Sequence, residues 1–265
     1  MGDAPLNLYM KRILARVLHR MGYSMVRNSS LASLNAAASH GRCLEFLAAL
    51  PPNHVSELLK LIPHSQAQLR QDLFVLSELS LKRGGFFVEF GAASGKELSN
   101  TWLLEKYFGW KGILAEPAKC WHAALATNRS CVIEQDCVWK STGDELEFLE
   151  SSQPELGTLA GFQDVDGHAK ARESSKRYRV KTVSLGDLLA RHQAPTELDY
   201  LSIDTEGSEF EILRGFDFAK HPFKTITCEH NHTSSREKIH ALLMAAGYVR
   251  KYEAFSDFDD WYVRA

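Results

Sequence analysis

The stretch of sequence that decides the fold is Phe87-Val-Glu-Phe-Gly-Ala-Ala-Ser-Gly-Lys-Glu97. Its apolar start predicts a strand over residues 86–90, because a short apolar run that ends at glycine is typical of a buried strand. A turn of small residues follows, and we expect a helix from this turn to about Phe108. Small residues let the backbone approach a ligand, and a helix N-terminus offers free N–H groups. The residues assigned to this ligand-binding turn are Gly91, Ala92, Ser94 and Gly95.

The spacing of the glycines distinguishes between two classes of ligand. A turn that binds the pyrophosphate of a dinucleotide has glycines at relative positions 1, 3 and 6, whereas Gly91 and Gly95 stand at positions 1 and 5. In addition, Glu89 precedes the turn, and its carboxylate would repel a pyrophosphate. The same carboxylate suits a cationic amino or sulfonium group. We therefore predict that Glu89 and the turn bind S-adenosylmethionine rather than NAD or FAD.

Acids also follow the next two predicted strands, residues 113–115 and 131–133. Glu116 stands where a carboxylate accepts hydrogen bonds from the two hydroxyls of a ribose. It also suits a helix N-terminus, with Pro117 at the first helical position. Asp136 could accept from the amino group of an adenine, with the backbone of Cys137 against the ring. We assign Glu116, Pro117, Asp136 and Cys137 to the cofactor.

The chain from residue 81 to the end alternates short apolar runs with amphipathic stretches. Strands that alternate with helices predict a doubly wound α/β domain with a mostly parallel sheet. Residues 248–253 and 261–264 could pair as a hairpin, which would give the sheet an antiparallel edge strand. The polar residues 140–179 do not fit the alternation. We expect a loop there, either a lid or acceptor-binding loop or a solvated connection without a role.

Carboxylates and histidines follow the predicted central strand, residues 200–203, and the next one, residues 225–228. Open α/β folds bind ligands at the carboxyl ends of such strands. Methyl transfer to an alcohol requires that a proton leave, and a carboxylate or a histidine can accept it. Alternatively, a divalent metal, Mg or Mn, could acidify the hydroxyl.

The residues that we assign to catalysis or substrate binding are Asp204, Glu206, Glu229 and His230. Asp204 is assigned to the cofactor as well, and Asp204, Glu229 and His230 are the candidate metal ligands. Simpler interpretations stay open for two of them. Glu206 suits the first turn of a helix, and His230 could make an ordinary buried hydrogen bond.

Residues 1–80 are predicted to form an N-terminal helical region before a catalytic domain over residues 81–265. Residues 6–26 predict a basic amphipathic helix, since apolar residues recur at helical spacing. Its lysines and arginines interrupt the apolar residues throughout, unlike a signal peptide. This helix could pack on the domain, contact a second subunit in a homo-oligomer, or lie on an anionic membrane surface.

The composition is that of an ordinary globular protein, with 45% hydrophobic and 24% charged residues in a chain of 265. A formal net charge of −2 argues against nucleic acid as the partner. Five cysteines without a CxxC pair indicate reduced thiols in a cytoplasmic protein. No stretch approaches the roughly 20 apolar residues of a membrane span. We expect a cytoplasmic protein, with membrane association only through residues 6–26.

Three segments together resemble the FkbM-type methyltransferase family: FVEFGAASG at 87–95, LDYLSIDTEGSEFEILRG at 198–215 and ITCEHN at 226–231. The resemblance covers roughly residues 83–255. It implies a Rossmann-like, seven-stranded fold and S-adenosylmethionine-dependent O-methylation, often of sugars in polysaccharides, glycolipids or natural products. By position, it places Glu89, the turn, Glu116 and Asp136 at the cofactor and the later acids on the acceptor side. Ser94 departs from the many related turns that have glycine there.

These observations predict an S-adenosylmethionine-dependent O-methyltransferase that acts on a hydroxyl of a sugar or glycan. Two alternatives stay open. The acceptor could be another small molecule or group, such as a polyketide hydroxyl, an amine or RNA. The chain could also be a non-catalytic partner subunit with the same fold, although neither the turn nor the acids are broken here.

Overall fold

The computed structural model describes residues 41–265, and the chain divides into two compact units, Met1–Glu45 and Phe46–Ala265. The described residues of the first unit, 41–45, are helical. The second unit starts at Phe46, earlier in the chain than the predicted start of the catalytic domain at residue 81. That domain boundary remains a prediction. The predicted basic helix over residues 6–26 lies outside the described residues. Within residues 41–265, no helix is long and apolar enough to cross a membrane.

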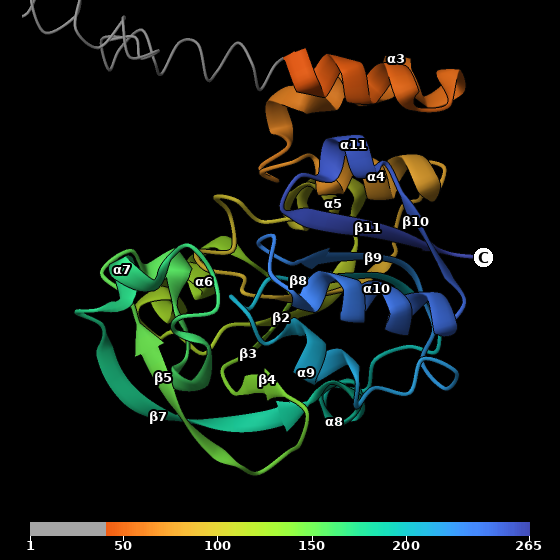
Figure 1. Cartoon of the computed structure of the whole chain (residues 1–265). Coiled ribbons are helices and arrows are strands. Elements are labelled where there is room, and N and C mark those ends of the chain that lie inside the picture. Colours follow the sequence, from red (N-terminus) through yellow and green to blue (C-terminus); the bar gives the residue numbers. More distant parts are fainter. Residues whose placement is uncertain (1–40) are drawn as a thin grey trace, which may run out of the picture. The chain divides into compact units, whose positions relative to one another are not determined.

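The second unit is built on a central sheet of seven strands: β1 (Phe86–Phe90), β2 (Lys111–Ala115), β3 (Val132–Glu134), β8 (Leu198–Ile203), β9 (Phe223–Glu229), β10 (Tyr248–Lys251) and β11 (Asp259–Arg264). Their order across the sheet is β10-β11-β9-β8-β1-β2-β3 (Figure 1). Strands β9, β8, β1, β2 and β3 run parallel to one another, and β11 is antiparallel to both β9 and β10. The predicted doubly wound, mostly parallel sheet with an antiparallel edge is confirmed.

The strand order determines where a ligand can enter. The chain lays down β1, β2 and β3 in one direction and then returns to place β8 and β9 on the other side of β1. The strands β1 and β8 are neighbours, with Phe90 opposite Ile203 at their carboxyl ends. The connections that leave these two ends diverge, and open α/β sheets bind ligands in the crevice between them.

Helices cover both faces of this sheet (Figure 1). Helices α4 (Gln71–Glu78) and α5 (Trp102–Phe108) lie on one face, and α8 (Leu185–Arg191), α9 (Glu209–Leu213) and α10 (Ser235–Ala245) lie on the other. Every residue of β8 is buried as a result. The other helical segments are α3 (Pro52–Leu61), η1 (Ile62–His64), η2 (Lys119–Trp121), α6 (His122–Asn128) and α11 (Glu253–Ser256).

Helix α4 is packed onto the antiparallel end of the sheet through aromatic rings. Phe74 stacks on Trp261 with 5.0 Å between ring centroids, and both side chains are fully buried. Gln71 donates from Nε2 to the carboxylate of Asp259, at 3.0 Å. This part of the N-terminal helical region therefore shares a core with the sheet.

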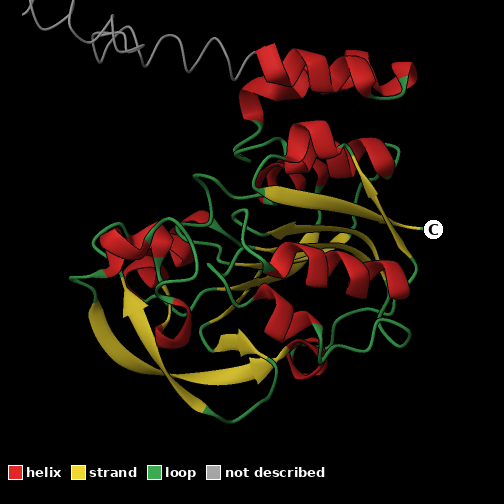
Figure 2. Ribbon diagram, viewed as in Figure 1, coloured by secondary structure: helices red, strands yellow, loops and turns green. Residues whose placement is uncertain are grey.

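A second, smaller sheet corrects the loop expected over residues 140–179. It consists of β4 (Cys137–Trp139), β5 (Glu145–Glu150), β6 (Thr158–Leu159) and β7 (Lys176–Ser184), in the order β4-β7-β5-β6. Figure 2 shows its long strands apart from the central sheet. Between its strands lie the short helices η3 (Pro154–Leu156), η4 (Ala160–Phe162) and α7 (Ala169–Arg172). The expectation of an irregular loop is wrong, because β5 and β7 pair over six residues each.

The turn after β1 also differs from the prediction. No helix begins at the glycine turn, because residues 91–101 form a longer irregular segment and α5 begins only at Trp102. A single parallel bridge joins Leu98 of this segment to Ala67. The backbone that borders β1 is therefore a loop of eleven residues held by side chains, and not the first turn of a helix.

Candidate functional site

A cleft lies at the carboxyl ends of β1, β2 and β8 and is partly open to solvent; its space is about 900 Å³ when the open solvent at its mouth is included. One wall is the loop after β1, and the opposite wall comes from the second sheet, with Phe148 and Leu159. The predicted residues that line the cleft are Glu89, Gly91, Ala92, Glu116, Pro117, Cys137, Asp204 and Glu206. The topology thus brings most of the predicted donor-side residues together with two of the acceptor-side acids.

Gly91 occupies the point where the loop passes closest to β8. Its φ is +70°, and a Cβ atom there would lie 1.8 Å from the backbone oxygen of Asp204. The N–H of Gly91 donates to the carbonyl of Ala115 at the end of β2, at 3.1 Å. Only glycine combines this left-handed conformation with this close approach. The residue therefore joins the ends of three strands at the cleft.

The carboxylate of Glu89 is hydrogen-bonded to the loop after β1. It accepts hydrogen bonds from the backbone N–H of Asn100, at 2.7 Å, and from the hydroxyls of Ser99 and Thr101. The guanidinium of Arg129, fully buried, lies 3.7 Å away and also donates to the carbonyl of Gly95. The charge of Glu89 is therefore already compensated, and its main effect is to fix the loop that lines the cleft.

Glu116 holds the turn to the second strand. Its two carboxylate oxygens accept from the N–H groups of Ala93 and Ala118, both at 2.8 Å. Burial raises the pKa of this carboxyl to about 7, although the two N–H groups act in the opposite direction. No helix begins at Pro117, since η2 begins at Lys119. A carboxyl at this place can accept from a hydroxyl when it is ionised and donate to one when it is protonated.

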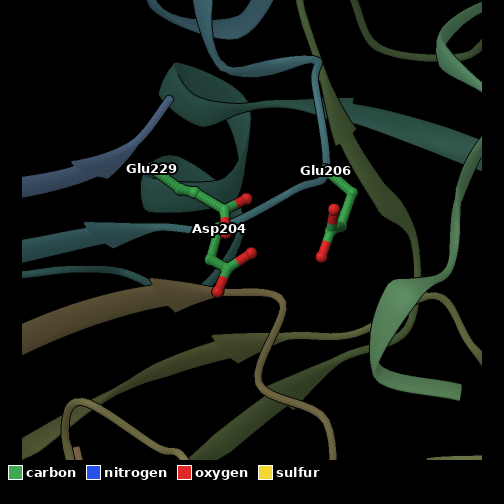
Figure 3. A group of neighbouring side chains, drawn as sticks. All are labelled: Asp204, Glu206 and Glu229. Carbon is green, nitrogen blue, oxygen red and sulfur yellow. The ribbon is translucent and has the colours of Figure 1, made fainter. Parts of the chain in front are cut away.

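The acids at the ends of β8 and β9 form a compact group. One carboxylate oxygen from each of Asp204, Glu206 and Glu229 lies within 4.8 Å of the others, and the three side chains point into one shared space (Figure 3). Asp204 and Glu229 follow residues that are paired across the two strands, Ile203 and Cys228. Burial raises the pKa of Asp204 to about 7 and that of Glu229 well above its usual range. The group therefore retains protons at neutral pH.

Glu206 reaches this group through a left-handed backbone, with φ of +57°. Arg172 of the second sheet's connection donates to its carboxylate at 2.8 Å, and Asp166 binds the same guanidinium at 2.8 and 2.9 Å. All three side chains are at least nine-tenths buried. Burial and Asp204 raise the pKa of Glu206 against the opposing charge of Arg172. The second sheet thus sets the position of one of the three acids.

The profile of the methyltransferase FkbM domain matches residues 89–262. The chain belongs to the FkbM methyltransferase family. A search of curated proteins found no match.

Solved structures with a similar fold include methyltransferase FkbM from Methylobacillus flagellatus KT. The identity is 13%, the TM-score is 0.43, and the match covers 80% of this chain and 59% of that chain. This chain therefore spans less than two thirds of the length of that structure. Precorrin-6y C5,15-methyltransferase from Geobacter metallireducens GS-15 has 12% identity and a TM-score of 0.37, with 72% of this chain and 85% of that chain covered.

Five predicted site residues of this FkbM methyltransferase do not line the cleft at the ends of β1, β2 and β8: Ser94, Gly95, Asp136, Glu229 and His230. Ser94 borders a neighbouring hollow, and a Cβ atom on Gly95 would lie 2.7 Å from side-chain atoms of Leu125 and Arg129. Asp136 pairs with Arg191 at 2.8 Å, while the following residues, Cys137 and Val138, face the cleft. A role for Asp136 at an adenine stays a prediction.

His230 does not join the metal set predicted for it. Its Nδ1 accepts from the N–H of His232 at 3.0 Å, and its Nε2 lies 3.7 Å from Asp260. Burial lowers the pKa of the imidazole. Among the described residues, the group with metal-ligand spacing contains Glu206 in place of His230. The predicted combination of Asp204, Glu229 and His230 is therefore not brought together.

Several cleft residues of the FkbM methyltransferase were not found by sequence reasoning. They include Gln68, Ser99, Asn100, Phe148, Glu155, Ser202, Thr205 and Ser208. Ser99 and Asn100 come shortly after the glycine turn, and their polar character was an available signal. Gln68 carries no such signal, because it lies before the segment that resembles the family and reaches the cleft only through the fold.

The arrangement has two chemically different ends. At one end, backbone and Glu116 offer hydrogen-bonding groups beside small residues. At the other, Asp204 and its neighbours offer carboxyls that take up and release protons near neutral pH. Membership of a methyltransferase family implies S-adenosylmethionine as the methyl donor in general.

Proposed function

We propose that this chain is an S-adenosylmethionine-dependent O-methyltransferase that acts on a hydroxyl of a sugar or glycan. The observation that carries the proposal is one continuous cleft that joins the glycine turn and Glu116 to Asp204 and Glu206. The donor would occupy the first end and the acceptor the second. The sugar as acceptor is supported by the family resemblance, in which sugars are frequent acceptors.

The donor end suits S-adenosylmethionine in shape and charge. The loop after β1 brings backbone N–H groups close to the cleft, and Glu116 lies at the end of β2, where it can bind the hydroxyls of a ribose. Cys137 and Val138 present an apolar surface for a ring. The sulfonium and ammonium of the donor are cationic, and a cation beside Asp204 and Glu206 favours the ionised form of these acids, which then attract the end that carries the methyl group.

Asp204 is the residue that we assign as general base. The bound donor supplies a methyl group on a positively charged sulfur, which is open to attack by an oxygen in line with the bond that breaks. Asp204 lines the cleft, and a base is most effective when its pKa lies near the working pH. The pKa of about 7 meets this condition. Asp204 would take the hydroxyl proton, and Glu229 beside it would share that proton.

Calorimetric titration with S-adenosylhomocysteine tests the donor site. We expect the wild type to bind, and Glu116→Gln to bind at least tenfold more weakly, because a lost charge-assisted hydrogen bond costs about 1.5–3 kcal/mol. Glu197→Gln is the matched control, since Glu197 is exposed and directly precedes β8, at the end of the strand opposite to the cleft. Absence of binding by the wild type, or equal binding by Glu116→Gln, would refute the assignment.

A divalent metal is a second way to activate the hydroxyl. Asp204, Glu206 and Glu229 offer the oxygen ligands that Mg²⁺ and Mn²⁺ prefer, at suitable mutual distances. Activity after exhaustive chelation separates the two mechanisms. With Asp204 as the base, we expect the chelated enzyme to keep its rate, whereas Asp204→Asn loses about a hundredfold or more. A rate that disappears on chelation and returns with Mg²⁺ or Mn²⁺ would favour the metal.

A further inference from the structure

Six acidic side chains line the cleft: Glu89, Glu97, Glu116, Glu155, Asp204 and Glu206. Burial raises the pKa of Glu116, Asp204 and Glu206, whereas Glu97 and Glu155 are exposed at the mouth. Among residues 41–265, no lysine, arginine or histidine lines this cleft. Two of the six are compensated by buried guanidinium groups behind the wall, Glu89 by Arg129 and Glu206 by Arg172. The other four form no ion pair with a lysine, arginine or histidine of residues 41–265.

A neighbouring hollow continues the cleft outward with the same character. It shares Ala93, Glu97, Leu98 and Glu155 with the cleft and adds Gln66, Ser94 and Trp121. Of the described residues that line it, none is cationic. Trp121 is one of the residues that line it, and its buried indole N–H has no hydrogen-bond partner among the described residues. The amides of Gln66 and, in the cleft, Gln68 suit hydroxyl groups.

Two buried oxygen atoms in and behind this cleft lack hydrogen-bond partners among the described residues. They are Oδ1 of Asn100 and Oε2 of Glu229, and each residue is only 8% exposed. Asn100 lines the cleft, with its amide nitrogen held by Ser202 at 2.9 Å, which leaves Oδ1 as an acceptor. A buried acceptor without a partner is costly. Oδ1 of Asn100 therefore calls for a ligand that donates a hydrogen bond, whereas Glu229 lies behind the cleft beside Asp204.

We propose that the acceptor enters as an uncharged, polyhydroxylated sugar, a neutral glycoside, and not as a sugar phosphate or a nucleotide-activated sugar. This inference rests on the proposed function. Proteins bind phosphate through arginine, lysine or clustered N–H groups, and the outer part of this cleft offers Glu97 and Glu155 instead. Hydroxyl groups donate to carboxylates and amides, whereas a phosphate only accepts at neutral pH.

The test compares one sugar in two forms, as the methyl glycoside and as the phosphate, at saturating S-adenosylmethionine. Hexoses that differ in configuration are compared in such pairs, and kcat/KM for methyl transfer is measured for each. We expect the neutral member of every active pair to be preferred by about tenfold or more, as for a like charge brought near several carboxylates. Transfer to neither member of any pair would refute the sugar methyltransferase itself, and preference for the phosphate would overturn the inference alone.

Charge removal at the mouth of the cleft gives a second readout. Glu97 and Glu155 are exposed, so Glu97→Gln/Glu155→Gln should fold. We expect the ratio of kcat/KM for the phosphate to that for the glycoside to rise by about fivefold or more, since exposed charges contribute modestly and are screened by salt. Glu197→Gln/Glu237→Gln removes the same charge outside the cleft and should leave this ratio unchanged. An equal change in both double variants would overturn the inference.

Discussion

At the scale of single residues, Asp204 combines two opposing demands. Its carboxyl is placed beside two other acids, which suits a proton acceptor but costs stability whenever the group is ionised. The pKa is raised from 3.8 to about 7, chiefly by burial. Between these values the folded protein holds a proton that the unfolded chain has released. The free energy of unfolding therefore falls as the pH rises from about 4 to 7.

Asp204→Asn removes this ionisation, and we expect it to stabilise the protein while it inactivates the enzyme. At pH 8 the variant should exceed the wild type by about 2 kcal/mol in free energy of unfolding, since a pKa change of one is worth about 1.4 kcal/mol and neighbouring acids share the effect. Near pH 4 the difference should vanish. Urea unfolding at both pH values measures it, and a variant that is less stable than the wild type at pH 8 would contradict the argument.

The position of His230 shows why sequence reasoning places some site residues correctly and others not. Successive side chains of a strand point to opposite faces. Glu229 and His230 are adjacent, so that only one of them can face the acids of β8, and the left-handed conformation of Asn231 then turns the chain away. Gly91, Glu116 and Asp204 were predictable because each directly follows its strand. The position of His230, which follows Glu229, could not be predicted from the sequence, because it depends on the backbone conformation after β9.

At the scale of elements, the second sheet was not predicted from the sequence, because many of its side chains are exposed to solvent. Strand β7 carries charged residues on one side and pairs with β5, in which only the last three residues are buried. Such a pattern has few apolar positions and includes Gly157 in a tight connection, which favours an interpretation as a loop. The central strands were predictable because helices cover both of their faces, which produces continuous apolar runs. The hairpin of β10 and β11 was predicted and is confirmed.

Helix α4 gives a test of where the catalytic unit begins. A chain that starts at residue 81 would lose Phe74 and expose Trp261, whose large buried side chain packs against it. Loss of such a contact costs about 3–5 kcal/mol, a large share of the stability of a domain. We expect a chain over residues 46–265 to unfold cooperatively, and one over 81–265 to lack the near-ultraviolet signal of fixed aromatic rings. Identical melting of both chains would place the boundary after residue 80.

At the scale of the whole molecule, the cleft lies between the two sheets, so that a bound donor should link them. S-adenosylhomocysteine at a hundred times its Kd should stabilise the folded state by about 2.7 kcal/mol. For a chain of this size, that raises Tm by about 5–10 °C. Hydrogen exchange should slow in β5 and β6 as well as in β1. Glu116→Gln should show a smaller shift in Tm, and protection confined to the central sheet would contradict a site shared by both.

The buried contact of Arg172 with Asp166 and Glu206 has a consequence for how such enzymes diverge. A side chain at position 207 would meet Val165 and Phe162, with a Cβ atom 2.6 Å from Val165. The segment around residues 162–172 and the segment around residues 206–207 therefore limit which substitutions the other can accept, although they are far apart in the sequence. Loss of Arg172 alone would leave two carboxylates buried without a counter-ion, which is strongly destabilising. Among relatives, positions 166, 172 and 206 should change jointly, and a transplanted second sheet should function only when its own partner for Glu206 comes with it.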